Sequence, residues 1–263
     1  MEIKKIKNKT SDIFFQRYLL IIIFVFVIIK VNVAQEKPGS DTPILFRSEK
    51  SWGGLIHTEG FGVNYWIGKH KTAAIKRMYE FELVTMKHPK EIKSINPYFE
   101  NAKSYKFGKL NYAALLRANI GRVRTLNNKP YWGGVEVRYM YFAGLAAAIL
   151  KPVYLSILYP TAIPYKYLVV DEKYDPSKHN SDLIYGRASF FKGFNELKFY
   201  PGLDTKLGLS FEYGRKAELV RSIDIGVTAD MFLKKVPIMA FNNNNNYFIT
   251  FFISLHFGKR KYY

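Results

Sequence analysis

Residues 218–233 read ELVRSIDIGVTADMFL, and the polarity of this stretch changes at almost every position. The odd positions are nearly all apolar, whereas the even positions are small or polar and include Asp224 and Asp230. Because successive side chains of a strand point to opposite faces, this period of two predicts an extended strand between two different environments. Hydrocarbon on one face and carboxylates on the other are typical of a membrane barrel with a polar interior. A soluble antiparallel sheet with one wet face gives the same alternation, so this stretch alone leaves both interpretations open.

The alternation recurs along the chain, which decides between the two interpretations. Strands are predicted over 55–67, 73–86, 109–123, 134–147, 205–213, 218–233 and 247–257, with a weaker one over 43–50. No helical pattern of comparable strength could cover the apolar face of such a sheet. We therefore predict an all-β fold, an antiparallel transmembrane β-barrel of eight strands with long extracellular loops, in a domain spanning 43–263.

Loop lengths predict how the strands connect. The short connections 68–71, 126–130 and 214–216 are expected in the periplasm, and the long ones, 87–106, 151–202 and 234–246, outside the cell. Residues 51–54 (SWGG) are expected to turn, and 189–199 to form a short amphipathic helix inside the longest loop. Aromatic residues near strand ends predict interfacial girdles, namely Tyr65, Tyr79, Tyr139, Tyr213, Tyr247 and Phe257.

The amino terminus has the pattern of an export signal. Five Lys and Arg side chains within 1–17 precede an unbroken apolar run over 18–29, which is too short to cross a bilayer as a helix. A small residue, Ala34, follows, so we predict a signal peptide over 1–34, cleaved after Ala34, and a polar leader over 35–42. An uncleaved inner-membrane anchor is the alternative. The chain has no cysteine, so disulfides do not stabilise it.

The charge of the mature chain indicates an anionic partner. Removal of 1–34 leaves 34 Lys and Arg side chains against 19 carboxylates, a net charge of +15. A nucleic acid is not expected for an exported protein, whereas the phosphates of lipopolysaccharide in the outer leaflet are suitable. Five lysines that follow the outward ends of two strands are the predicted contacts, namely Lys87, Lys90, Lys93, Lys234 and Lys235. A solvated, solubilising loop face is the alternative role for them.

Several short motifs carry a family resemblance. They are KHPKE (87–91), PGL (201–203), VPIMA (236–240) and the closing FGKR (257–260). With these motifs, most of 43–260 resembles the small, largely uncharacterised outer-membrane β-barrel proteins of the Bacteroidota. The resemblance implies an outer-membrane location and no particular activity. The chain departs from a common outer-membrane pattern because KRKYY (259–263) follows Phe257, the last aromatic residue of the final predicted strand.

The predicted inward faces carry charges of both signs. They are Lys76, Glu80, Glu82, Lys109, Arg117, Glu136, Arg138, Lys206, Glu212, Glu218, Asp224, Asp230 and His256. Inward side chains fill a barrel of eight strands, and buried charges need partners, so we predict a salt-bridged polar plug. The leading functional hypothesis is therefore a non-enzymatic scaffold, or a surface-binding protein that acts through its extracellular loops. A narrow solute channel is the alternative.

An enzyme that modifies lipid A is a third hypothesis. It would need a nucleophile and a base within hydrogen-bond reach, and Ser254 and His256 lie two residues apart on one inward face. His57 and Glu59 have the same spacing on another strand. Neither pair matches the catalytic spacing of known lipid A enzymes, and no histidine pair has metal-ligand spacing. We therefore expect no catalytic residue, no metal and no cofactor.

Overall fold

The computed structural model describes residues 46–262 of the chain, apart from 73, 100, 129–133, 162–166, 215 and 217. The predicted signal peptide over 1–34 and the leader over 35–42 lie outside the described residues. Residues 44–263 form one compact unit. No helix in the described part of the chain has the length and hydropathy to cross a bilayer.

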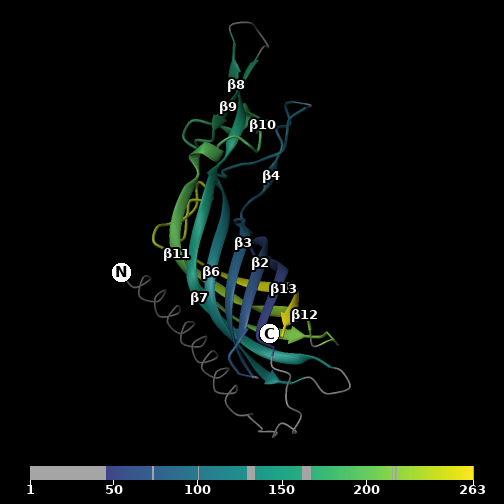
Figure 1. Cartoon of the computed structure of the whole chain (residues 1–263). Coiled ribbons are helices and arrows are strands. Elements are labelled where there is room, and N and C mark those ends of the chain that lie inside the picture. Colours follow the sequence, from purple (N-terminus) through teal and green to yellow (C-terminus); the bar gives the residue numbers. More distant parts are fainter. Residues whose placement is uncertain are drawn as a thin grey trace, which may run out of the picture. The chain divides into compact units, whose positions relative to one another are not determined.

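Eight antiparallel strands close into a barrel (Figure 1). In chain order they are β1 (Ser48–His57), β2 (Gly60–His70), β3 (Ile75–Met86), β6 (Asn111–Asn127), β7 (Glu136–Pro152), β11 (Lys198–Glu212), β12 (Leu219–Phe232) and β13 (Tyr247–Lys261). Around the barrel the order is β1-β13-β12-β11-β7-β6-β3-β2, so the first strand pairs with the last. The prediction of a closed eight-stranded antiparallel barrel is confirmed. The alternating stretch 218–233 forms β12, with its odd positions outward and its even positions inward.

The first hairpin differs from the prediction. Residues 51–54 do not turn but belong to β1, and the turn lies at Thr58 and Glu59, within the segment 55–67 that was predicted as one strand. Gly53 faces inward, where a Cβ would lie 2.6 Å from Asn64 Oδ1 and 2.6 Å from the carbonyl oxygen of Leu255. This glycine is therefore needed for close approach of neighbouring strands and not for a turn.

The connections divide between the two ends of the barrel. We call the end with the turn at 58–59 and the connections 87–110, 153–197 and 233–246 the loop end. We call the opposite end, with connections 71–74, 128–135 and 213–218 and both ends of the barrel chain, the turn end. The predicted alternation of long and short connections is thus confirmed. Whether the loop end faces the cell exterior stays a prediction.

The longest connection is a folded sheet, not an irregular loop. It contains β8 (Tyr154–Pro160), β9 (Tyr167–Lys173) and β10 (Ile184–Arg187), paired in the order β10-β8-β9, which we call the loop sheet. The short turns η1 (Ser181–Leu183) and η2 (Phe194–Glu196) and the small pair β4 (Lys93–Ser94) and β5 (Tyr105–Lys106) accompany it. The helix predicted over 189–199 is wrong, because Gly193 has a left-handed backbone (φ 86°) and β11 begins at Lys198.

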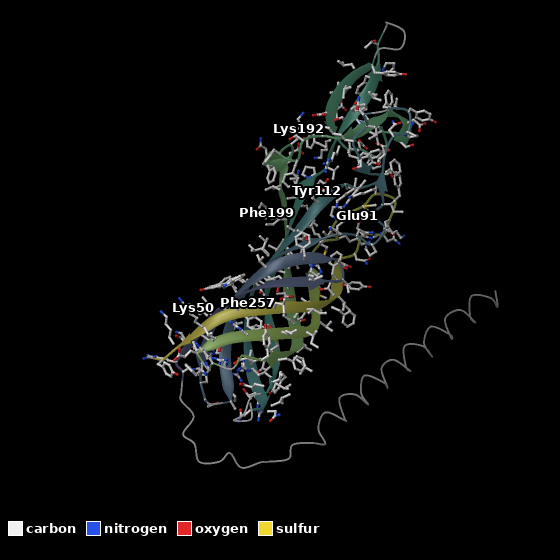
Figure 2. All side chains as sticks on the ribbon, turned by 90° about the vertical axis from the view of Figure 1, so that its right-hand side faces the viewer. Lys50, Glu91, Tyr112, Lys192, Phe199 and Phe257 are labelled. Atoms are coloured by element: carbon white, nitrogen blue, oxygen red, sulfur yellow. The ribbon has the colours of Figure 1, made fainter. Side chains whose placement is uncertain are left out.

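The outer face of the barrel is apolar, whereas the inner face combines buried charges with buried apolar side chains such as Met78 and Phe142. All eight strands place exposed apolar side chains on the outer face, including Ile56, Val63, Leu83, Leu116, Leu145, Leu207, Ile225 and Ile253. Leu145 is 67% exposed and Phe251 64% exposed. Of the predicted girdle residues, Tyr65, Tyr213, Tyr247 and Phe257 are exposed, and Tyr79 and Tyr139 are half-buried. Figure 2 labels Lys50 and Phe257 toward the turn end, and Tyr112 and Lys192 toward the loop sheet.

Candidate functional site

A network of ion pairs occupies the middle of the barrel, and we call Glu80, Glu82, Arg117, Lys206 and Asp230 the central cluster. Arg117 binds Asp230 with two hydrogen bonds, from Nε at 2.8 Å and from Nη2 at 2.7 Å. Its Nη1 also donates to Glu82. Lys206 Nζ donates to Glu80 Oε1 at 2.7 Å and to Glu82. These five side chains hold one another in fixed positions across the bore.

Strand register brings the central cluster together. Glu82 on β3 lies directly opposite Arg117 on β6, so this pair is a cross-strand neighbour. Asp204 on β11 lies directly opposite Asp230 on β12, which places two like charges side by side. Arg117 lies between them, with its Nε 3.6 Å from Asp204 Oδ1. Arg117 therefore faces three carboxylates that have few other cations to neutralise them.

A second network closes the turn end of the barrel. Glu49 Oε2 accepts hydrogen bonds from Lys76 Nζ at 2.7 Å and from Arg260 Nε at 2.8 Å. Arg138 donates to Glu136 at 2.7 Å and pairs with Glu212, which Arg260 also contacts. Sequence reasoning missed Glu49 and Arg260. Arg260 could have been found by continuing the inward even positions of the last strand beyond Phe257.

His256 and Asp224 lie deep in the wall between these networks. His256 Nε2 lies 3.2 Å from Asp224 Oδ2 and 3.1 Å from Asn64 Nδ2, and its ring is tilted against the Trp66 ring with centroids 4.0 Å apart. Ser254 Oγ is buried and makes no hydrogen bond within the described residues. Since Ser254, His256 and Asp224 are all at most 1% exposed, no substrate reaches them in this conformation. Their arrangement does not form an accessible nucleophile and base.

In the other predicted pair, His57 and Glu59, the histidine ring makes hydrogen bonds with the backbone. His57 Nε2 lies 3.1 Å from the carbonyl oxygen of Thr85, and His57 Nδ1 accepts the backbone N–H of Glu59 at 3.3 Å. These contacts shape the first hairpin. Among the described residues, no group of three or more His, Cys, Asp or Glu side chains could hold a metal ion.

Two predicted interior residues lie elsewhere. Lys109 precedes β6 at the loop end, where its Nζ donates to Glu91 Oε1 at 2.6 Å. Burial lowers the pKa of Lys109 to about 8. Burial would raise the pKa of Glu91, but hydrogen bonds from Lys106 and Lys109 outweigh it and lower the pKa. Glu218 is exposed in the turn before β12, so its predicted inward position is wrong.

The bore is closed along its length. Glu80, Glu82, Arg117 and Lys206 are at most 2% exposed, so they are almost inaccessible to water. At the loop end, the connection 233–246 folds back over the bore. Its Val236, Ile238 and Met239 belong to one cluster of buried apolar residues with inward side chains of the barrel strands. Leu110 N–H donates to the carbonyl oxygen of Ile238 at 3.0 Å, which ties this lid to the start of β6. The VPIMA motif thus supplies an apolar lid.

A cavity of about 610 Å³ opens between the loop sheet and the end of the barrel. Its lining includes Lys103, Lys151 and Arg187 and a single carboxylate, Asp171. Hydrogen bonds from Lys192 and Ser156, at 2.7 and 2.6 Å, hold Asp171 and lower its pKa. We call this cavity the loop pocket. Its net positive lining suits a compact anion, and sequence reasoning missed it because the residues come from separate loop segments.

The five lysines predicted to contact lipopolysaccharide are exposed at the loop end. They do not form one cluster, since Lys87 follows β3 and Lys234 follows β12, and these strands are four positions apart in a ring of eight. Lys87 Nζ lies 5.6 Å from the centre of the Phe61 ring. Lys90 Nζ donates to Asn242 Oδ1 at 3.3 Å, which links the connections 87–110 and 233–246.

Comparison with known proteins identifies no family. No model of a protein family matches the chain, and no curated protein is significantly similar to it. Among solved structures, Neisserial surface protein A (NspA) has a TM-score of 0.40 at 9% identity, with 82% of this chain and 96% of that chain covered. The N-terminal β-barrel domain of Pseudomonas aeruginosa OprF has a TM-score of 0.37 at 10% identity, covering 82% and 99%.

A third solved structure is similar at the same level. Ail, the attachment invasion locus protein of Yersinia pestis, has a TM-score of 0.36 at 8% identity, with 81% of this chain and 95% of that chain covered. Similarity this weak says nothing about what the chain binds, and the fold rests on its own strand pairing. The resemblance to outer-membrane proteins of the Bacteroidota stays a prediction.

Proposed function

We propose that this chain is a non-enzymatic integral protein of the outer membrane, with a closed interior and a binding surface at its loop end. The observation that carries the proposal is the apolar outer face, to which all eight strands contribute. The largest apolar patch on a soluble monomer is roughly 300–600 Å², whereas this face surrounds the whole barrel. The outward apolar run over 247–257 also matches the roughly 9–11 residues that a tilted strand needs to cross a bilayer.

The closed interior favours a scaffold over a channel. The central cluster spans the bore with charge-assisted hydrogen bonds, and the apolar lid covers its loop end. An ion that crossed the barrel would have to separate several buried ion pairs at once, each of which is costly to break. The buried positions of Ser254 and His256 argue in the same way against the lipid A enzyme.

The first test uses refolded protein in detergent and in planar bilayers. We expect the unboiled protein to migrate differently from the boiled protein in gel electrophoresis, because a closed sheet has no free edge from which to unfold. We also expect no stable, ion-selective openings in the bilayer. Identical migration would contradict the membrane barrel, and steady openings would contradict the closed interior while leaving the barrel intact.

The binding surface that we propose is the loop pocket, and its ligand is a phosphate-bearing group such as that of lipopolysaccharide. Lys103 and Arg187 make no described ion pair with a carboxylate, so they are available to an anion. Lys151 is already engaged, with its Nζ donating to the carbonyl oxygens of Phe190 at 2.6 Å and Lys192 at 3.1 Å. The five exposed lysines around the loop end would add weaker contacts with phosphates of the surrounding leaflet.

The second test separates the pocket from its surroundings. We expect Lys103→Gln with Arg187→Gln to lower lipopolysaccharide co-purification by about tenfold, and the five-fold Lys→Gln variant at 87, 90, 93, 234 and 235 to lower it less. Both effects should weaken as salt rises, because screening weakens phosphate contacts. Arg77→Gln with Arg122→Gln, two exposed cations at the turn end, is the charge-matched control. Unchanged co-purification in both loop-end variants would contradict the phosphate-binding role.

A further inference from the structure

The outer face at the turn end carries a group of exposed cations. Arg221 lies on β12, Lys259 and Lys261 on β13, Lys50 on β1, Lys69 on β2 and Arg77 on β3, and all of them point away from the bore. These five strands are consecutive around the barrel. Within the described residues, none of these six cations forms an ion pair with a carboxylate. At the loop end the outward strand positions are mostly apolar, and the exposed lysines at 87, 90, 93, 234 and 235 lie beyond the ends of the barrel strands.

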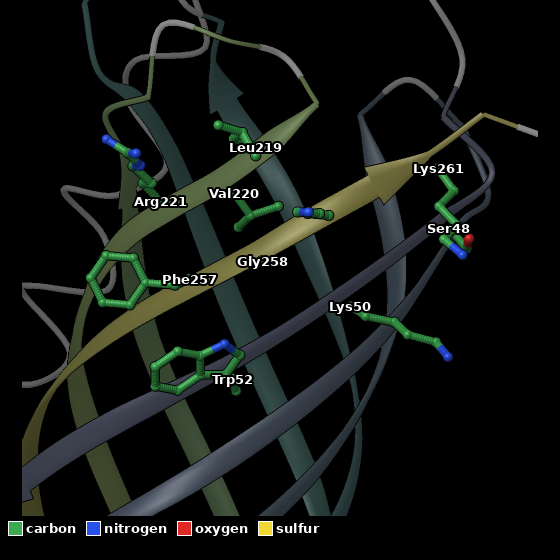
Figure 3. Close-up of a pocket in the computed structure, with 10 residues that line it drawn as sticks. Ser48, Lys50, Trp52, Leu219, Val220, Arg221, Phe257, Gly258 and Lys261 are labelled. Atoms are coloured by element: carbon green, nitrogen blue, oxygen red, sulfur yellow. The ribbon is translucent and has the colours of Figure 1, made fainter.

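Four of these cations surround a groove on the outer wall (Figure 3). The groove has a volume of about 490 Å³ and is lined by Lys50, Arg221, Lys259 and Lys261, together with the aromatic rings of Trp52 and Phe257. The two rings lie side by side with centroids 5.9 Å apart. The groove therefore has an apolar part toward the middle of the barrel and a cationic part toward the turn end.

Strand register places like charges together in the groove. Lys50 lies directly opposite Lys259 on the neighbouring strand, an arrangement that is unfavourable unless an anion lies nearby. The nearest exposed carboxylate along the chain is Glu218, whose backbone carbonyl accepts a hydrogen bond from Arg260 N–H at 2.7 Å. Its side chain makes no described ion pair with the groove. The protein itself thus leaves this cationic part without a described counter-charge.

We propose that the groove binds an anionic phospholipid, with its phosphate at Lys50 and Lys259 and an acyl chain against Trp52 and Phe257. This inference rests on the proposed membrane insertion, because only then does the groove face lipid. It also rests on the predicted sidedness, in which the connections 71–74, 128–135 and 213–218 face the periplasm, so that the groove faces the periplasmic leaflet. The lipid of that leaflet is phospholipid, so the ligand differs from the one proposed at the loop end.

Tryptophan fluorescence tests the proposal directly. Trp52 is 64% exposed in the groove, whereas Trp66 is buried inside the barrel, and Trp132→Phe removes the third tryptophan. The protein is refolded into phosphatidylcholine bilayers that contain either brominated phosphatidylglycerol or brominated phosphatidylcholine at equal mole fraction. We expect the anionic lipid to quench Trp52 more strongly at low salt. Trp52→Phe should abolish the difference between the two lipids.

Charge variants identify the residues responsible. A cation at a membrane surface contributes about 1 kcal/mol, or about fivefold in binding. Lys50→Gln with Lys259→Gln removes two cations, so we expect it to lower the preference for phosphatidylglycerol by up to about 20-fold. Little or no preference should then remain. Lys50→Arg with Lys259→Arg should keep it. Lys87→Gln with Lys234→Gln removes the same charge at the loop end and should also keep it.

Each contrary outcome has a distinct meaning. Equal quenching by the two lipids, or an unchanged preference in the double Gln variant, would overturn the inference while leaving the membrane barrel intact. Quenching by neither lipid from a heat-modifiable, inserted barrel would show that a second copy of the chain covers the groove, which also overturns the inference. Quenching by neither lipid together with a lack of heat modifiability would overturn the proposed membrane insertion itself.

Discussion

Replacing Arg117 with alanine is expected to lower the free energy of unfolding by about 3–5 kcal/mol, which is the usual cost of removing one partner from a buried ion pair. Arg117 is 2% exposed and contacts Glu82, Asp204 and Asp230. Without the guanidinium, these carboxylates stay buried in the bore, and among the described residues only Lys206 forms an ion pair with one of them, Glu82. We expect the urea midpoint of the refolded barrel, followed by tryptophan fluorescence, to fall accordingly.

Two further variants make the Arg117 measurement specific. Arg122 lies five residues further along the same strand, on the exposed outer face. Arg122→Ala therefore removes the same type of side chain outside the bore and should change the urea midpoint little. Combining Arg117→Met with Glu82→Gln, Asp204→Asn and Asp230→Asn removes the stranded charges and should recover much of the lost stability. If Arg117→Ala and Arg122→Ala have equal effects, the central cluster does not stabilise the barrel.

The architecture could be predicted because one physical pattern repeats in it. Each strand of the barrel lies between an apolar outer environment and a filled interior, so the same period of two appears in every strand. The stretch 218–233 shows this period most clearly and forms β12 in the structure. Strand parity then required a first strand, predicted over 43–50 where the pattern is weak, and β1 occupies Ser48–His57, so its existence was predicted but its position was several residues too early.

The first hairpin could not be located from the sequence. Its turn residues, Thr58 and Glu59, are not among those that favour tight turns, whereas Gly53 and Gly54 suggested one nearby. Gly53 is glycine because Asn64 and Leu255 approach its backbone closely. Such an approach depends on which strands become neighbours. The local sequence cannot distinguish it from a turn.

The partners of the interior charges were also beyond sequence reasoning. Alternation indicates that Arg117 and Asp230 face the bore, but the two residues are 113 positions apart in the chain and meet across it. Their contact depends on barrel closure and on the stagger between strands. The loop sheet could not be predicted for a related reason. Its strands are short, and its core residues Val153, Tyr174 and Ile184 come from separate segments of the chain.

Replacing Ile253 with arginine is expected to lower the free energy of unfolding by about 2–4 kcal/mol, the cost of a charge at the middle of a bilayer. Ile253 lies near the centre of the outward apolar run of β13 and is 57% exposed. Leu126→Arg is the matched control, because Leu126 is 59% exposed but lies at the turn end of β6, beyond Arg122 and Arg124. It should cost about 0–1 kcal/mol. In a barrel surrounded by water, both side chains would be solvated and both substitutions nearly neutral, so equal urea midpoints for the two variants would contradict membrane insertion.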